Sequence, residues 1–532
     1  MNKAAALLLC LLSAPLSLAA RTDNIDLPFR GDPEVLGRWR SVAYVDSAEE
    51  FSPDAVQPAE ELFFKGLEFL PGGATESGNE IWTRGFVISP ADRTASKYEL
   101  KRLGGEEYLF MEWKSGDYIL RGTAPGYYVL VREKDYARLG PEDARPERAA
   151  PKSYNCMNAT LGRGICRRPE PAVFSREPFK ELPVYKPGSE KSWQVDLRGM
   201  DLRKLDLSGR TADLLRADFD TRTKFPKALP PGYVPEEILE LGKNPGLGVR
   251  ALHQRGLTGK GVAIAIIDQP LLTGHKEYSG ALKSYEELHL FEKAPAAAMH
   301  GAAVASIAVG KTCGVAPGAS LHYLATDFTD GARGIDFRFL ASAVDRVVAI
   351  SEALPKGKGI RALSISRGFR PGDRGAAALL ESIAKARKAG MLVVTTSPEA
   401  YYDFRFNGLG RGPLSDPDSR DSYRPGLFWE RTFYPGGRNE SGRLLLPMDS
   451  RTTASPAGSE DYVFYTEGGM SWAAPYLAGL YALALEADPA LSPEAFLRRA
   501  LATAGAARFS RDGVDFSLEG IVDPASLLTV QE

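Results

Sequence analysis

The pattern of hydrophobic and polar residues changes in character near residue 235. Before this point, residues 34–134 contain short aromatic and β-branched runs separated by Gly, Pro and Asp, which predicts an antiparallel β-rich domain. After it, short continuous apolar runs alternate with segments of helical periodicity, and such runs are typical of parallel strands buried on both faces. We therefore predict a doubly wound, mainly parallel α/β domain over residues 235–532, preceded by a small β-barrel.

Three apolar runs define the predicted parallel strands: residues 262–267, 362–366 and 391–394. A helical segment from Gly375 to Ala389 lies between the last two and ends at Gly390, a residue type favoured after helix C-termini. Parallel strands joined by helices bring their carboxyl ends to one edge of the sheet. Open α/β sheets bind their ligands at that edge.

A five-residue rhythm occurs in residues 135–234, which otherwise read as an irregular linker. Leu197, Leu202 and Leu207 are spaced five apart, and each follows an Asp. This resembles pentapeptide-repeat sequence, in which the inward Leu residues stack inside a β-helix. The repeats are too few for an independent solenoid. We predict a short β-coil packed against a neighbouring element.

The first twenty residues differ from the rest. Lys3 precedes the apolar residues 4–12, and Ser17-Leu18-Ala19-Ala20 follows before Arg21, which predicts a secretory signal peptide cut after Ala19 or Ala20. The apolar run is shorter than the roughly 20 residues that span a bilayer. We predict a periplasmic or secreted protein without stable membrane insertion, and the sequence leaves its oligomeric state open.

Composition gives no support to nucleic-acid or membrane-surface binding, because 66 basic residues oppose 68 acidic ones for a net charge of −2. Of the cysteines after the signal peptide, Cys156 and Cys166 bracket a Gly-containing loop and can pair in an oxidising compartment. Cys313 is then an unpaired thiol. No His or Cys cluster has zinc-site spacing, and we expect no metal and no cofactor.

Ser471 is the strongest candidate for chemistry. It follows Gly468-Gly469-Met470 and opens an apolar run that reaches Leu485, which places its hydroxyl at a helix N-terminus. Helix N-termini favour negative charge, which suits a serine whose substrate becomes an oxyanion. Ser at such a position is also a common helix cap. The segment alone leaves both interpretations open.

Two upstream residues favour the nucleophile. Asp268 directly follows the strand 262–267, and His300 begins a helix of small residues. Alone, the Asp is typical of a turn and the His of a structural residue, and His275 is a second histidine near Asp268. An Asp, a His and a Ser in this chain order, each at a strand end or helix start, is the order of the subtilisin triad.

The surrounding residues resemble the motifs of subtilisin-like serine proteases over roughly residues 240–525. His300-Gly301 with Val304-Ala305 is similar to H-G-T-x-V-A, residues 314–319 to G-V-A-P-x-A, and residues 469–479 to G-T-S-x-A-x-P-x-x-A-G. The resemblance implies that Ser471 attacks the scissile carbonyl, His300 transfers the proton and Asp268 orients the imidazole. Ser364, Ser366 and Gly368 resemble the family's substrate strand, which pairs with a peptide through its main chain.

The sequence departs from this family at the oxyanion hole. The family's Asn in A-A-G-N has no counterpart, because the strand at residues 392–394 is followed by Thr-Thr-Ser-Pro-Glu. Loss of such a donor costs roughly 3–4 kcal/mol of transition-state stabilisation. Asn407 is the candidate substitute, with a turn residue as its alternative interpretation. The backbone N–H of Ser471 remains a donor.

The sequence thus predicts an exported serine endopeptidase that hydrolyses proteins or peptides through an acyl-enzyme intermediate. The alternative is a weak or inactive subtilase fold that works as a binding protein. In that case the barrel, whose Gly37-Arg38-Trp39 resembles the lipocalin G-x-W signature, is a ligand-binding module. A barrel of this size either holds one small ligand or is filled by its own side chains. The expected domains are residues 1–20, 34–134, 135–234 and 235–532.

Overall fold

The structure of the chain is a computed structural model. It describes residues 23–529, apart from residues 54–55, 58–61, 63, 77, 79, 91–92, 115–124, 141–152, 175–178, 187–193, 328–334, 371–372 and 437–441. The predicted signal peptide, residues 1–20, lies outside the described residues. Within the described part of the chain, no helix is both long and apolar enough to cross a membrane.

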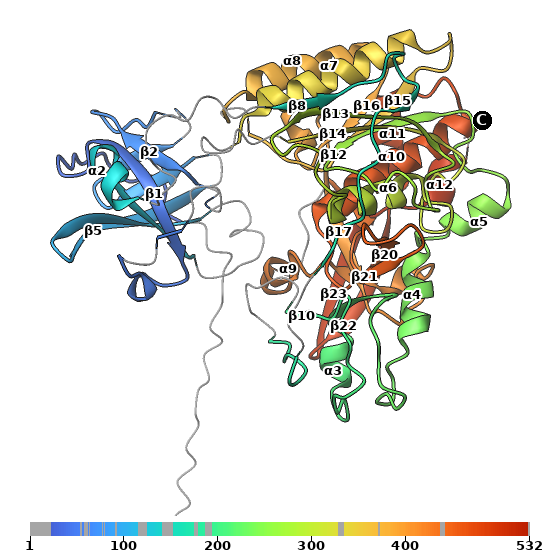
Figure 1. Cartoon of the computed structure of the whole chain (residues 1–532), viewed down its shortest axis with the longest axis horizontal. Helices are drawn as coiled ribbons and strands as arrows, with labels where there is room; N and C mark the ends of the chain where they lie inside the picture. Colours follow the sequence, from blue (N-terminus) through green and yellow to red (C-terminus); the bar gives the residue numbers. More distant parts are fainter. Residues whose placement is uncertain are drawn as a thin grey trace, which may run out of the picture.

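Seven antiparallel strands form the predicted barrel, drawn in blue in Figure 1. Their order is β2-β1-β7-β6-β5-β4-β3, and bridges from Phe69 to Thr75 and from Ala74 to Ile81 bring the two edges almost to closure. The helix α2 (Glu133–Leu139) follows the last strand. The strands are β1 (Gly37–Val45), β2 (Gly66–Phe69), β3 (Ile81–Thr83), β4 (Phe86–Ser89), β5 (Thr94–Leu103), β6 (Glu106–Glu112) and β7 (Tyr127–Arg132).

Large side chains pack in the interior of this barrel. Trp39 is fully buried, its indole N–H donates to the Val35 carbonyl at 2.7 Å, and the Arg132 guanidinium lies 4.5 Å from its ring centre. Further aromatic rings share this buried cluster: Phe69, Trp82, Tyr98 and Tyr128. This packing favours the barrel filled by its own side chains over the one that holds a ligand.

The elements from β8 to α12 form the larger part of the chain. Its main sheet has the order β16-β15-β12-β14-β13-β8, with β9 also paired to β13. Every pairing is parallel except that of β8 with β13, so the predicted doubly wound, mainly parallel fold is confirmed. The strands are β8 (Tyr154–Cys156), β9 (Gly164–Ile165), β12 (Ala263–Asp268), β13 (Leu282–Leu290), β14 (Ser320–Thr326), β15 (Ile360–Ile365) and β16 (Leu392–Val394).

Helices cover both faces of this sheet, with α7 (Phe337–Ala353) and α8 (Ala376–Lys388) on one side and α6 (Met299–Val309) and α10 (Met470–Ala487) on the other (Figure 1). Successive residues of β12 therefore enter two different cores. Ala263, Ala265 and Ile267 pack with α7 and α8, whereas Ile264 and Ile266 pack with α6 and α10. Burial on both faces is the physical reason for the continuous apolar run in the sequence.

Residues upstream of 235 form part of a second sheet, of order β10-β11-β21-β20. Leu197, Leu202 and Leu207 are all buried there, as the five-residue rhythm predicts for inward positions. The parallel pair β10 (Val195–Asp196) and β11 (Ala217–Asp220) joins β21 (Tyr462–Tyr465) and β20 (Arg451–Ala454), and the nearby helices are α3 (Thr211–Leu214), α4 (Pro235–Lys243) and α5 (Val249–Gln254).

A third sheet, of order β18-β17-β19-β23-β22, completes the larger part of the chain. It is followed along the chain by α12 (Pro524–Leu528), which packs against α10. Its strands are β17 (Arg405–Arg411), β18 (Tyr423–Pro425), β19 (Arg443–Pro447), β22 (Gly505–Arg511) and β23 (Val514–Ile521), and the remaining helices are α9 (Glu430–Gly436) and α11 (Pro493–Ala502).

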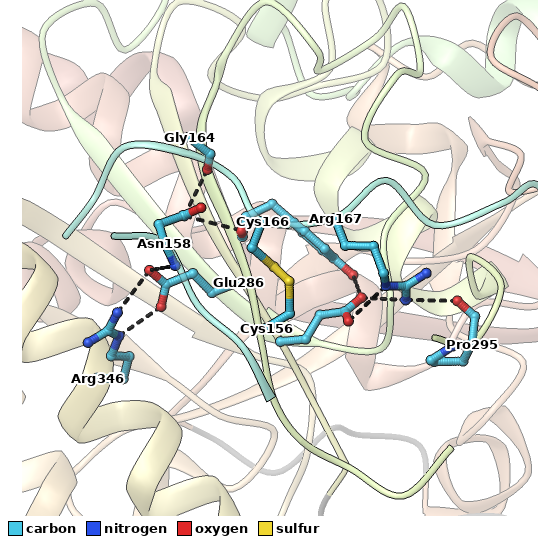
Figure 2. The surroundings of a disulfide bond; sticks show 10 residues. Cys156, Asn158, Gly164, Cys166, Arg167, Glu286, Pro295 and Arg346 are labelled. Carbon is cyan, nitrogen blue, oxygen red and sulfur yellow. Dashed lines mark hydrogen bonds and ion pairs between the residues drawn. A yellow bond between two sulfur atoms is a disulfide. The ribbon is translucent and has the colours of Figure 1, made fainter. Parts of the chain in front are cut away.

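A disulfide joins Cys156 to Cys166 and confirms the expected pairing (Figure 2). It closes the loop between β8 and β9, which both pair with β13 at the edge of the main sheet. Asn158 donates to the Gly164 carbonyl within the loop, and the Arg167 guanidinium donates to Glu287 of β13 at 2.9 Å. The disulfide therefore holds together the two short linker strands that pair with the main sheet.

Replacing both Cys156 and Cys166 by Ser should lower the free energy of unfolding of the larger part of the chain by roughly 2–3 kcal/mol. The bond closes a loop of about ten residues, and its loss returns conformational entropy to the unfolded chain. Urea denaturation followed by tryptophan fluorescence measures the change. Wild-type protein in reducing agent should match the double variant, and an unchanged midpoint in both samples would contradict the expectation.

Candidate active site

Asp268 is the last residue of β12, so its carboxylate lies at the carboxyl edge of the main sheet as predicted. The side chain is buried, and one carboxylate oxygen, Oδ1, accepts two hydrogen bonds. They come from His300 Nδ1 at 2.7 Å and from the Gln269 backbone N–H at 2.8 Å. The carboxylate is thus fixed in place and directed at the histidine ring.

His300 is the second residue of α6 and reaches Asp268 because this helix begins close to the end of β12. The Ala298 N–H, just before the helix, donates to the Pro270 carbonyl at 2.8 Å. A Cβ on Gly301 would lie 2.5 Å from the Gln269 carbonyl oxygen, which is closer than real contacts allow. Glycine is therefore required where the helix crosses the strand end.

Two opposing effects act on the pKa of His300. Burial disfavours the charged ring, but the Asp268 charge and its hydrogen bond outweigh burial and raise the pKa above its ordinary value. Because Nδ1 donates to Asp268, Nε2 is the nitrogen left to accept a proton. His275 has no such role: it is fully buried, Nε2 donates to the Asp461 carbonyl, and Nδ1 accepts from the Glu277 N–H.

Ser471 is the second residue of α10, and Gly469 is the N-cap, so the interpretation of Ser471 as a helix cap is wrong. Its hydroxyl donates to the Ser366 carbonyl at 3.3 Å, and the Ser366 hydroxyl donates to the Ser471 carbonyl at 2.8 Å. These reciprocal bonds hold the start of α10 against the chain that continues from β15. In this state the hydroxyl of Ser471 is directed at Ser366.

One cavity of about 210 Å³ brings Asp268, His300 and Ser471 together. Its walls come from the carboxyl ends of β12, β14 and β15, from α7 and from the starts of α6 and α10. The other lining residues are Ile267, Gln269, Thr326, Leu340, Ile365, Ser366 and Arg367. A carboxylate, an imidazole and a hydroxyl around one cavity at the edge of an α/β sheet are the groups that nucleophilic catalysis requires.

The three residues expected to bind substrate lie differently. Ser366 lines the cavity, just past the last paired residue of β15. Gly368 lies two residues further along, and a Cβ there would lie 2.8 Å from the Thr396 hydroxyl oxygen. Ser364 is fully buried within β15, between β12 and β16. Its side chain therefore faces the protein interior and is inaccessible to a substrate.

Asn407 lies in β17, in a different sheet from β12, and is buried. Its side-chain oxygen accepts from the Gly408 N–H at 2.9 Å, and it is not among the described residues that line the cavity. The turn after β16 is organised instead by Tyr401, whose hydroxyl bonds both the N–H and the side chain of Thr395.

Sequence reasoning missed four residues that line the cavity: Gln269, Thr326, Leu340 and Arg367. Thr326 ends β14, the strand that pairs with β12, so a predicted strand order would have placed it there. Gln269 and Arg367 directly adjoin residues that the sequence identified. Leu340 carries no such signal, because it reaches the cavity only through the packing of α7 on the sheet.

No group of three or more His, Cys, Asp or Glu suited to a metal ion occurs in the described ranges. Asp416 and Asp418, which flank a Pro, have structural partners. Asp418 accepts from the Gly248 N–H at 2.9 Å and from the Asn244 amide at 2.8 Å, and Asp416 accepts from the Asp418 N–H at 2.9 Å. These bonds tie the connection between α4 and α5 to the rest of the fold.

Parts of the chain are similar to known proteins. A family model described as the subtilase family matches residues 259–398, which include Asp268 and His300. Similar solved structures include the prenylagaramide maturation protease PagA, 17% identical over 53% of this chain and 98% of that one, with a TM-score of 0.38. Another is MycP1, a serine protease of the type VII (ESX-1) secretion system, 18% identical over 54% and 89%, at 0.36. Fervidolysin from Fervidobacterium pennivorans is 17% identical over 55% and 47%, at 0.39.

The His300 imidazole should titrate above its ordinary pKa of about 6.5, and Asp268→Asn should lower that pKa. Because the folded state favours the protonated ring, the pair stabilises the fold at pH values below about 6.5. This contribution is lost as the pH rises through the raised pKa of His300.

NMR titration of the five histidines measures these values. His322 is an internal control, because its burial lowers its pKa to about 4. A wild-type pKa of His300 at or below about 6.5, or an unchanged value in Asp268→Asn, would show that the carboxylate does not govern the ring.

Proposed function

We propose that the chain, which matches a subtilase family model over residues 259–398, is an exported serine endopeptidase acting through Asp268, His300 and Ser471. The observation that carries the proposal is the 2.7 Å hydrogen bond from His300 to Asp268, beside a cavity that Ser471 also lines. Its substrates are proteins or peptides, as the family implies.

In the proposed reaction, His300 Nε2 takes the proton of the Ser471 hydroxyl as the serine oxygen attacks the scissile carbonyl carbon. The tetrahedral intermediate collapses when the imidazolium gives that proton to the leaving amine, which leaves an acyl-enzyme. Water then attacks the ester carbonyl while His300 takes a proton from it. The imidazolium gives this proton to the Ser471 oxygen, which releases the acid product and restores the hydroxyl. Asp268 holds the ring with Nδ1–H toward itself and stabilises the imidazolium, as the raised pKa of His300 indicates.

The Ser471 hydroxyl must first leave the Ser366 carbonyl. Hydrogen bonds of catalytic groups are often loose without substrate and tighten in the complex. Ser366 follows Ile365, the last residue of β15 that pairs with β12, and in the proposed complex a peptide strand pairs with the chain at this point. A substrate that pairs there competes for the Ser366 carbonyl, which releases the nucleophile next to His300.

The oxyanion donor that we propose is the backbone N–H of Ser471. It lies in the first turn of the 18-residue helix α10, where N–H groups have no partner within the helix. The helix dipole adds to its effect on a developing negative charge. We assign no side chain as the second donor.

We propose export to the periplasm or the outside of the cell. The signal-peptide pattern of residues 1–20 supports it. The Cys156–Cys166 disulfide supports it independently, because such bonds persist in oxidising compartments.

A fluorophosphonate probe should label wild-type protein at Ser471, and labelling should vanish in Ser471→Ala. His300→Ala should slow labelling by about a thousandfold or more, because the serine then lacks its general base. Ser342→Ala, in an exposed part of α7, is the matched control and should be labelled at the wild-type rate. Mass spectrometry of the labelled peptide measures both site and rate.

Absence of labelling in folded wild-type protein would exclude the enzyme and leave a subtilase fold that acts by binding. In that outcome, a shift in melting temperature with lipophilic ligands would point to the barrel as the functional part. Labelling at any other serine would also contradict the assignment of Ser471.

A further inference from the structure

Residues 182–186 and 194–233, here named the upstream coil, contain the strand β11, which packs directly on the strand that leads to Ser471. Phe219 and Asp220 of β11 pair antiparallel with Phe464 and Val463 of β21. The rings of Phe219 and Phe464 lie 5.5 Å apart, inside a buried cluster that also takes in Leu197 and Ile238. The chain then leaves β21 at Tyr465 and reaches Ser471 in the first turn of α10.

A carboxyl group of the upstream coil holds the chain between β21 and α10. Asp218 is buried, and its Oδ1 accepts from the Thr466 N–H at 2.8 Å. The Thr466 hydroxyl donates to the Ala217 carbonyl at 2.8 Å. Burial raises the pKa of Asp218 to about 8, and Oδ1 can accept the Thr466 hydrogen bond in the neutral and in the charged form.

The opposite side of this segment is held by Asp449. Its Oδ1 accepts from the Gly468 N–H at 2.8 Å, and its Oδ2 accepts from the Leu427 N–H at 2.7 Å. A Cβ on Gly468 would lie 2.4 Å from the Met448 carbonyl oxygen, so the segment has no room to move toward that side. Asp218 and Asp449 thus bind alternate N–H groups just before the nucleophile.

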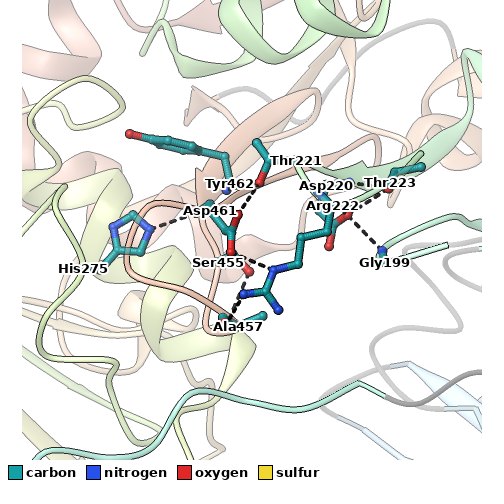
Figure 3. Close-up of polar contacts among 10 residues, drawn as sticks. All are labelled: Gly199, Asp220, Thr221, Arg222, Thr223, His275, Ser455, Ala457, Asp461 and Tyr462. Carbon is teal, nitrogen blue, oxygen red and sulfur yellow. Dashed lines mark hydrogen bonds and ion pairs between the residues drawn. The ribbon is translucent and has the colours of Figure 1, made fainter. Parts of the chain in front are cut away.

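The upstream coil is also attached to the loop before β21, as Figure 3 shows. The Thr221 hydroxyl donates to Asp461 Oδ1 at 2.9 Å, and Arg222 Nε donates to Asp461 Oδ2 at 2.7 Å. Arg222 also donates to the Ala457 carbonyl at 2.7 Å. The backbone carbonyl of Asp461 accepts from His275, so this residue connects the coil to the turn that follows Asp268.

A last contact links the upstream coil, through Tyr465, to Trp472, the residue after Ser471. Arg198 of the coil donates to the Tyr465 hydroxyl at 3.2 Å, and its guanidinium lies 5.4 Å from the Tyr465 ring centre. The Tyr465 ring in turn lies 5.2 Å from the ring of Trp472. Removal of the coil would expose this aromatic surface and leave the buried Thr466 N–H without an acceptor, which disfavours any form that lacks it.

We propose that the upstream coil stays in the mature enzyme and that Asp218 is a positioning residue, which fixes the segment Thr466–Gly468 and through it the hydroxyl of Ser471. The inference rests on the proposed function only in that the fixed residue is the nucleophile. Asp218 contacts no substrate and takes no part in proton transfer.

Variants of the full chain test the positioning role. Asp218→Leu removes the accepting oxygen and keeps a side chain of similar size. Because a misplaced nucleophile slows the chemical step, this variant should label at Ser471 at least tenfold more slowly with fluorophosphonate. For a peptide substrate, kcat should fall and KM should stay nearly unchanged. Asp218→Asn keeps an accepting oxygen and should stay within about threefold of wild type. Asp201→Leu, at an exposed carboxylate of the same coil, is the control and should be unaffected.

Hydrogen–deuterium exchange gives a readout that needs no activity. Exchange of residues 462–469 should increase in Asp218→Leu and remain slow in Asp218→Asn. If Asp218→Leu does not fold, Arg222→Met replaces it in the test, because the Arg222 side chain is half-exposed. This variant should increase hydrogen–deuterium exchange around Asp461. Wild-type labelling together with wild-type exchange in folded Asp218→Leu, or in Arg222→Met if that variant replaces it, would overturn the positioning role.

The mass of the mature, exported protein tests retention. It should correspond to a chain that still contains residues 182–233. A labelled enzyme that begins at or after residue 235 would overturn the inference while leaving the serine protease intact. A folded chain that never labels, yet shows the exchange changes in Asp218→Leu, would instead refute the proposed function and keep the structural role of Asp218.

Discussion

The arrangement of the site depends on how closely the start of α6 approaches the end of β12. Gly301 permits the approach, because any side chain there would collide with the Gln269 carbonyl. The small residues of α6 extend this contact into the core, where residues 301–309 are all buried. The 2.7 Å bond between His300 and Asp268 is a consequence of this packing, and so is the raised pKa of His300. The chemistry of the imidazole is therefore set by helix–sheet contact.

Ser471 is held in a different way, by polar contacts to the chain around it. Its hydroxyl and carbonyl exchange hydrogen bonds with Ser366, and the chain before it is bonded to two buried carboxyl groups, Asp218 and Asp449. Buried polar groups of this kind stabilise one backbone arrangement because any other leaves them without partners. The histidine thus depends on apolar packing, and the serine depends on hydrogen bonds from segments far apart in the sequence.

Local patterns predicted the elements on which the site is built. The apolar run before Asp268 is the strand β12, as predicted, and Asp268 ends it. The small-residue segment at His300 is the helix α6, as predicted, and His300 lies in its first turn. Ser364 shows the limit of such patterns. Its motif resembles a substrate strand, but β15 lies between β12 and β16 and the Ser364 side chain is buried. Leu340 reaches the cavity through the packing of α7, and Asn407 lies in another sheet. Both positions follow from tertiary contacts that no short motif encodes.

The upstream coil shows why a domain boundary read from composition differs from one defined by contacts. The pattern changes at residue 235, yet β11 completes a sheet with β20 and β21, and Phe219 shares a core with Phe464. A short β-coil has too little interior to fold alone. Its leucines are buried only because the later part of the chain covers them, and that part gains in return an acceptor for the Thr466 N–H. Each segment satisfies groups that the other would leave exposed or unpaired. This mutual dependence makes the upstream coil and the segment that leads to Ser471 one structural unit.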